Sequence, residues 1–217
     1  MDKNVEKAKK LFGIAPFDND SLPEFALKKC EVELKETPEN KRNGFLELKR
    51  RIQADKEINN IDFHEDFLRQ YLRRHKYDVK GAIKQMRNYV VFRRKEGKLF
   101  QNISDEYFTK GGVRNIVKIL PFRCPDGCPV VHLHFGKWDC EKMPAEDLKR
   151  FAIMMFLQLF RDPMTQINGI KTIYDFKGTS LQHLKFATVG NMYLYYNLAI
   201  VSGIVKRCLP KILKGLL

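Results

Sequence analysis

The densest group of side chains that could perform chemistry lies between Asn168 and Leu184. It contains Asp175, Ser180 and His183, and a carboxylate, a hydroxyl and an imidazole are the groups used in acid–base and nucleophilic catalysis. The stretch around Ser180 lacks the second glycine of the G-x-S-x-G turn, which argues against a serine hydrolase. A turn aspartate and a histidine at a helix start more often make structural hydrogen bonds than form an acid–base pair. We therefore interpret these residues as turn and cap residues, and expect no catalytic site and no enzymatic activity.

A second group of side chains could bind a metal ion. Cys124 and Cys128 have the spacing C-x-x-x-C, but no second pair of ligands follows at an interval typical of zinc sites, and the intervening Pro-Asp-Gly accounts for a turn. His132 and His134 alternate along a predicted strand, which would place both imidazoles on one face. Because no third ligand stands near them, we favour two histidines on one sheet face over a metal site. We expect neither a bound metal nor a cofactor.

The charge of the chain indicates an anionic partner. The 217 residues carry a net charge of +14, and 44% of them are hydrophobic. No acidic residue follows Asp175, and this last part of the chain is both basic and apolar. A basic surface attracts nucleic acid or an anionic membrane, but no RNA-binding or zinc-finger motif is present. We therefore favour an anionic membrane surface over a solvated basic face without a partner, and expect no nucleic-acid partner.

The cytoplasm is the expected compartment. The N-terminal residues 1–6 are charged and lack the apolar stretch of a secretory signal. The apolar run near the end is interrupted by Asn197 and is too short for a transmembrane helix. The five cysteines are scattered, which is typical of reduced thiols rather than of a disulfide framework. We expect a cytoplasmic monomer that associates peripherally with membranes.

Hydrophobic periodicity predicts the elements that must position these side chains. Residues 1–20 predict a loosely ordered lead, and residues 21–98 predict a helical module in which Thr37-Pro38 and Asp78 begin helices. The pattern then changes, with strands expected over residues 113–120, 129–135 and 170–176. A helix that is apolar nearly all round is expected over residues 144–161, and another helical stretch follows the last strand. The order β-β-α-β-α predicts an α/β fold with a mixed or mainly parallel sheet.

Several blocks of sequence match the motifs of one protein family in order and spacing. Residues 64–79 are similar to D-x-x-L-x-R-F-L-R-A-R-K-F-D-V, and residues 126–130 to D-x-x-G-R-P-V with Cys128 in place of the arginine. Residues 136–139 match G-x-W-D, and residues 168–183 resemble N-G-x-x-x-I-x-D-x-x-G-x-S-x-x-H. Together with the helical residues 22–52, these blocks resemble the CRAL-TRIO lipid-binding family, and within it the branch of tocopherol-transfer and retinaldehyde-binding-like proteins.

This resemblance implies both a fold and a function. Residues 21–98 would form the helical CRAL-TRIO N-terminal module, and residues 99–217 the lipid-binding domain, whose mixed or parallel sheet floors a hydrophobic pocket. The implied function is to bind one small hydrophobic lipid, similar to tocopherol or a retinoid, and to transfer it between membranes. By position, the branch implies that the lipid pocket is lined by Ala152, Ile153, Phe156, Ile170, Tyr174, Ala187 and Leu198. For each of these residues the alternative is ordinary packing in the core.

The last residues depart from the pattern of the family. The family continues into another strand, a gate helix and further strands, so we expect the C-terminal part of the domain to be missing here, as in a fragment, a truncated gene model or a splice form. In the branch, a basic pair near this point recognises phosphoinositide headgroups; Lys214 matches it in register, and Lys211 lies beside the other position. We therefore expect docking on phosphoinositide membranes. Two alternatives stay open: a fold with an impaired pocket that acts as a membrane-surface or protein-interaction module, and a nucleic-acid binder.

Overall fold

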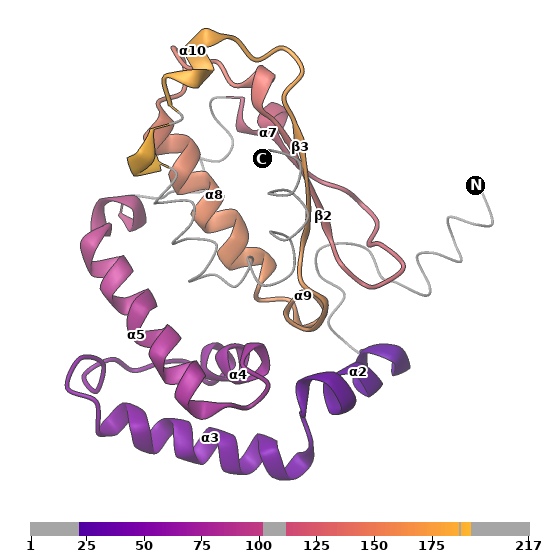
Figure 1. Cartoon of the computed structure of the whole chain (residues 1–217), viewed down its shortest axis with the longest axis vertical. Helices are drawn as coiled ribbons and strands as arrows, with labels where there is room; N and C mark the ends of the chain where they lie inside the picture. Colours follow the sequence, from indigo (N-terminus) through magenta and orange to yellow (C-terminus); the bar gives the residue numbers. More distant parts are fainter. Residues whose placement is uncertain (1–21, 102–111, 187, 192–217) are drawn as a thin grey trace.

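A group of N-terminal helices adjoins a small sheet with a long helix beside it (Figure 1). The computed structural model describes residues 22–101, 112–186 and 188–191. Four helices described in the first part of the chain fall within the range predicted to be helical: α2 (Glu24–Leu34), α3 (Pro38–Gln53), α4 (Glu65–Arg74) and α5 (Val79–Lys95). The 3₁₀ turn η1 (Gly97–Phe100) extends two residues past that range.

The predicted cap residues begin two of these helices. The Thr37 hydroxyl accepts a hydrogen bond from the Asn40 amide at 3.1 Å, before α3. The Asp78 carboxylate accepts one from the Lys80 amide at 3.1 Å, before α5. Such a cap pairs an N–H group that the first helical turn cannot satisfy, and contributes about 1 kcal/mol. The apolar sides of α3, α4 and α5 meet in one core cluster, in which Leu48 is fully buried.

The second part of the chain alternates strands and helices. Its elements are α7 (Val113–Ile116), β1 (Val117–Ile119), β2 (Val130–His134), the 3₁₀ turn η2 (Phe135–Lys137), α8 (Ala145–Leu159), α9 (Pro163–Asn168), β3 (Lys171–Asp175) and α10 (Leu181–Leu184). The prediction of a strand over residues 113–120 is wrong in its first half, which forms α7. Val113 and Ile116 are both buried, and residues three apart share one side of a helical turn but face opposite sides of a strand.

The three strands form a mixed sheet in the order β1-β2-β3. β1 runs antiparallel to β2, and β3 runs parallel to it. Side chains alternate along a strand, so Val131 and Leu133 face the core that α8 covers, and His132 and His134 face the other side. This arrangement confirms the predicted α/β class with a mixed sheet behind a helical N-terminal part.

Helix α8 is buried on two sides, as its sequence predicted. Figure 1 shows it between the strands and the N-terminal helices. Ile153 belongs to the core cluster of the N-terminal helices, and Leu157 packs against that cluster. Met155 and Leu159 belong to the second core cluster, which contains residues of β1 and β2. A helix between two cores needs apolar residues around most of its circumference.

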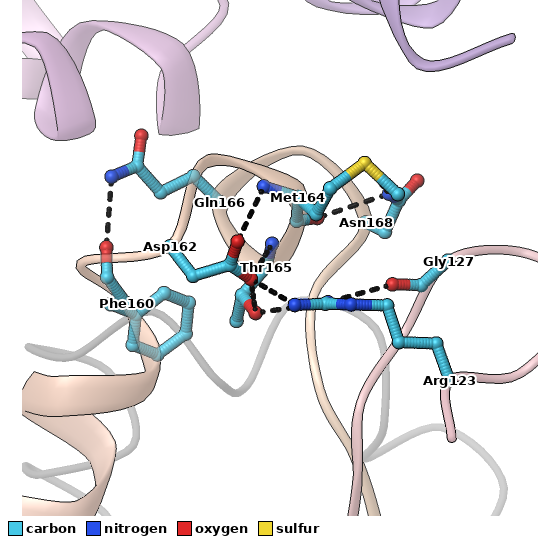
Figure 2. A network of polar contacts seen from close by, with 8 residues as sticks. All are labelled: Arg123, Gly127, Phe160, Asp162, Met164, Thr165, Gln166 and Asn168. Atoms are coloured by element: carbon cyan, nitrogen blue, oxygen red, sulfur yellow. Dashed lines mark hydrogen bonds and ion pairs between the residues drawn. The ribbon is translucent and has the colours of Figure 1, made fainter. Parts of the chain in front are cut away.

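A buried polar network fixes α9 against the connection between β1 and β2 (Figure 2). The Asp162 carboxylate, at the N-cap of α9, accepts hydrogen bonds from the Thr165 amide at 2.8 Å and from the Arg123 guanidinium at 2.5 Å. Arg123 also donates to the Gly127 carbonyl at 3.0 Å. Arg123 is 6% exposed and Asp162 is 0% exposed, so this ion pair is shielded from water. Helix α9 also packs on α2 and thereby joins the two parts of the chain.

Candidate functional site

A cavity of about 930 Å³ lies between the N-terminal helices and the C-terminal half of α8. We call it the aromatic cleft. Its size falls within the roughly 300–1,000 Å³ of ligand-binding pockets. Phe67 lies at the centre of its ring contacts, stacked on Phe63 at 5.4 Å and tilted against Tyr89 at 5.5 Å between centroids. Aromatic side chains supply much of the wall: Phe63, Phe67, Tyr71, Tyr89, Phe92, Phe100 and Phe160.

Polar side chains complete the lining of the aromatic cleft. Asp62, Asp66, Arg93 and Arg161 are exposed, so the charges lie on the solvent side of the cleft. The Arg93 guanidinium lies over the Phe100 ring at 5.5 Å, which couples a charge to the apolar wall. A largely apolar cavity with a charged rim suits a ligand that has an apolar body and one polar end.

The three predicted lipid-binding positions on α8 do not share one surface. Ile153 lines the aromatic cleft and is 1% exposed. Ala152 and Phe156 are half-buried, and Phe156 packs against the core beside the sheet. Residues four apart lie on the same side of a helix, whereas the next residue along is rotated by about 100°. Only Ile153 of the three therefore reaches the aromatic cleft.

The two predicted positions near β3 also separate. Ile170 is 5% exposed and belongs to the core cluster beside the sheet. Tyr174 is 47% exposed, and its ring stacks on Phe135 at 6.2 Å between centroids. Ala187, Leu198, Lys211 and Lys214 lie outside the described residues. The assignment of these side chains to a lipid or a headgroup stays a prediction.

A run of exposed apolar side chains follows Tyr174. Phe176 is 62% exposed and stacks on Phe135 at 5.2 Å, while Leu181 and Leu184 of α10 are 79% and 65% exposed. Val189 is 84% exposed. Single exposed apolar residues are common, but a group of them close together often marks a contact with a partner or a membrane. None of the helices in the described part of the chain has the length and apolar character that crossing a bilayer requires.

Two histidines and an aspartate meet at the carboxyl ends of β2 and β3. The parallel register pairs His134 with Asp175, whose Oδ2 atom lies 2.9 Å from His134 Nδ1 and 3.7 Å from His132 Nε2. The expectation that the two histidines have no third ligand nearby is wrong, because Asp175 is distant in sequence but adjacent across the sheet. Desolvation and the neighbouring His132 lower the pKa of His134 below its ordinary value, and Asp175 only partly opposes them.

Ser180 and His183 contact each other in a helix cap, whereas Asp175 takes part in a turn. Nδ1 of His183 accepts a hydrogen bond from the Ser180 amide at 3.0 Å, in a capping box at the start of α10. The other ring nitrogen of His183 lies 3.0 Å from the Trp138 carbonyl. Asp175 accepts a hydrogen bond from the Lys177 amide at 2.9 Å. These contacts confirm the interpretation of the three residues as turn and cap residues.

Cys124 and Cys128 close a turn, as predicted. The Cys124 amide donates to the Cys128 carbonyl at 2.9 Å, and the Cys128 thiol donates to the Asn168 carbonyl at 3.1 Å. Burial raises the pKa of Cys128 to about 12. Since metals bind the thiolate, a thiol that resists ionisation is a poor ligand.

Comparison with known proteins finds a domain model that matches part of the chain. Residues 115–202 match the model of the CRAL/TRIO domain. Two proteins named alpha-tocopherol transfer protein-like, from Homo sapiens and Mus musculus, are each 27% identical over 161 residues, which cover 74% of this chain and 47% of theirs. Clavesin-1 from Rattus norvegicus is 22% identical over 158 residues, 72% of this chain and 45% of its own. The chain thus spans about half of the length of these curated relatives.

Proposed function

We propose that this chain binds one small hydrophobic lipid and transfers it between membranes, because part of it matches the CRAL/TRIO domain. The match of residues 115–202 to that domain carries the proposal. The relatives named alpha-tocopherol transfer protein-like suggest a ligand similar to tocopherol or a retinoid, with an apolar body and one polar end. Transfer changes no bond in the ligand. The proposed function is therefore that of a carrier without enzymatic activity. We place this carrier in the cytoplasm, where it docks on membrane surfaces.

The aromatic cleft is the proposed ligand site within the described residues. Its seven aromatic rings offer a wall for an apolar body, and its charged rim offers partners for a polar end. A ligand that removes about 400 Å² of apolar surface from water gains roughly 10 kcal/mol by this effect. Part of that gain offsets the lost freedom of the bound ligand. The remainder is compatible with a carrier that must also release its ligand.

The predicted lipid-binding residues divide between two possible walls. Ile153 would contact a ligand in the aromatic cleft. Phe156 and Ile170 pack in the core beside the sheet, and Tyr174 lies on β3. Ala152 lies one helical turn before Phe156 on the same side of α8. These four residues would contact a ligand only if it binds on the side of the sheet. A variant on each side therefore distinguishes the two locations.

Lipid loading of cleft variants tests the proposal. Leu157 lines the aromatic cleft and is half-buried, so Leu157→Trp should fill the cavity and reduce loading at least tenfold. Val91→Trp adds the same ring at a position of α5 that is 53% exposed and outside the lining, and should load normally. Each protein is incubated with vesicles containing α-tocopherol or retinaldehyde and then separated from the vesicles by centrifugation. Native mass spectrometry then measures the fraction of the protein that carries the mass of the lipid.

Each outcome of this experiment has a defined meaning. Normal loading of Leu157→Trp with reduced loading of Tyr174→Asp would move the ligand from the cleft to the side of the sheet. A wild-type protein that takes up neither lipid from the vesicles would contradict lipid transfer by this chain.

The exposed apolar run favours a second candidate function, a membrane-surface or protein-interaction module with an impaired pocket. Phe176, Leu181 and Leu184 lie near Lys177 and Lys185 in the sequence, which is a suitable composition for an anionic membrane surface. Flotation with vesicles tests it, with and without phosphatidylinositol bisphosphate. Phe176→Asp with Leu181→Asp should abolish flotation, and binding without any loaded lipid would favour this candidate.

Phosphoinositide docking through Lys211 and Lys214 is part of the same proposal. Their replacement by glutamine should remove any preference for phosphatidylinositol bisphosphate over a vesicle of equal charge, because the basic side chains would supply the headgroup contacts. Equal flotation of the variant and the wild type would contradict this role.

A further inference from the structure

Three side chains on the outer face of the sheet have the spacing of metal ligands. One ring nitrogen of His132, one of His134 and a carboxylate oxygen of Asp175 all lie within 4.8 Å of one another, the one such group of three among the residues that the structure describes. Neighbouring ligands of a tetrahedral Zn²⁺ lie about 3.4 Å apart when each is about 2.0–2.2 Å from the ion. The observed separations of 2.9 and 3.7 Å from the Asp175 oxygen bracket this value. Side-chain rotations on the order of 1 Å would complete the set.

Strand register builds this group, so its geometry is set by the sheet. His132 and His134 alternate on β2 with ring centroids 3.8 Å apart, and Asp175 is the register partner of His134 on β3. The second oxygen of Asp175 accepts the hydrogen bond from the Lys177 amide, which directs the first oxygen toward the imidazoles. Metal-binding carboxylates are commonly oriented by such a second hydrogen bond.

All three side chains are partly buried but remain within reach of solvent. The exposed fractions are 23% for His132, 19% for His134 and 31% for Asp175. An ion could therefore enter without any rearrangement of the sheet, and would then be held by side chains on two strands. None of the three residues lines the aromatic cleft, so this site is separate from the proposed lipid site.

We propose that His132, His134 and Asp175 form a binding site for a divalent transition-metal ion, with Zn²⁺ as the best match. Two imidazoles and one carboxylate are a ligand set that Zn²⁺ and related ions accept. Three protein ligands leave a further coordination position for water or another ligand. The ion bridges β2 and β3 at the carboxyl ends of two parallel strands, the edge where α/β sheets commonly place ligands.

Neighbouring lysines limit the affinity of this site. Lys118 is the register partner of His132 on β1, and Lys137 and Lys177 also lie close enough to act on the group. Their positive charges oppose a bound cation, while Asp175 attracts it. Lys118 is exposed and is not a ligand, so Lys118→Gln should tighten Zn²⁺ binding without disturbing the ligand set.

Metal titration of the purified chain tests the proposal. The protein is treated with a chelator, dialysed and titrated with Zn²⁺ by calorimetry and with Co²⁺ by visible absorption. One ion per chain should bind at micromolar metal, and His134→Asn or Asp175→Asn should weaken binding at least tenfold. His64→Asn is the matched control, because His64 lies 3.5 Å from Asp66 in an exposed pair outside any such group of three, and it should bind normally.

The remaining outcomes separate this site from the cysteines. The double variant Cys124→Ser with Cys128→Ser should leave Zn²⁺ binding intact, and loss of binding in it overturns the proposal. Unchanged Zn²⁺ binding in His134→Asn and Asp175→Asn overturns it as well. Absence of saturable binding at micromolar metal also overturns it. Should a variant fail to fold by circular dichroism, the wild-type Co²⁺ spectrum decides, because nitrogen and oxygen ligands give no thiolate charge-transfer band.

Discussion

Replacing Asp162 by asparagine should destabilise the protein by about 3 kcal/mol. Asp162 is fully buried, caps α9 and pairs with the Arg123 guanidinium (Figure 2). Asparagine has nearly the same shape and caps helices as well as aspartate does. The substitution therefore keeps the cap and removes only the charge that offsets a buried arginine.

The contacts that remain to Arg123 set the magnitude. The Gly127 carbonyl at 3.0 Å and the Thr165 hydroxyl at 3.3 Å stay in place, and neither carries a charge. Neutralising one partner of a buried pair costs about 3–5 kcal/mol, and these two hydrogen bonds favour the lower end. Asp162→Ala removes the cap as well and should cost about 1 kcal/mol more. For a chain of this size, the loss of about 3 kcal/mol should lower the melting temperature by roughly 6–12 °C.

Urea unfolding followed by tryptophan fluorescence measures this loss. Trp138 is the single tryptophan of the chain, is 6% exposed and donates a hydrogen bond to the Met143 carbonyl at 2.9 Å, so it reports on the α/β part. Asp66→Asn is the control, because Asp66 is an exposed acid at the start of α4 and should cost less than about 1 kcal/mol. If Asp162→Asn costs no more than this control, the reasoning from the desolvated ion pair is refuted.

Three further predictions concern other buried contacts. Burial would raise the pKa of Glu36, but its ion pair with Arg73 outweighs burial and holds the pKa below 4.5, so the pair stabilises the fold fully above that pH and loses its effect as the pH falls further. The difference in urea midpoint between wild type and Glu36→Gln should therefore shrink from about pH 7 to about pH 3, and a constant difference would contradict the role of the pair. Gly136→Ala should cost about 1–3 kcal/mol in thermal unfolding, since its new Cβ would meet backbone atoms of Lys177 and Gly178. Gly97→Ala is the control, because its Cβ meets nothing within 4 Å, and equal losses in the two variants would be inconsistent with the close approach at Gly136. Cys128 should resist iodoacetamide at about pH 8 in the folded protein and react with it in urea, because its thiol is buried with a pKa of about 12. Peptide mass spectrometry measures the labelling, and labelling of the folded protein would count against that burial.

Local patterns were sufficient to predict most elements of the fold. Thr37 and Asp78 begin helices because their side chains pair backbone groups a few residues away. The apolar circumference of α8 predicted a helix between two cores. The same reasoning failed at Val113 and Ile116, whose β-branched side chains favour a strand in isolation. Burial of both on one side required a helical turn instead.

The candidate sites were harder to predict, because each depends on residues that are distant in the sequence. Ile153 reaches the aromatic cleft and Phe156 does not, since that cleft forms only where α8 meets α4 and α5. The wall of the cleft is built largely from aromatic residues of the N-terminal helices, which the family resemblance did not identify. Their heavy aromatic content was the one signal in the sequence that could have found them.

Patterns along the chain were enough to predict the helix starts, the buried helix, the α/β order and the resemblance to a lipid-binding family, because these depend on sequence neighbours. It also placed His132 and His134 on one face of a strand. That Asp175 completes this group became evident from the folded chain alone, since the parallel register of β2 and β3 joins residues about forty positions apart. A pair of histidines thereby became a candidate metal site.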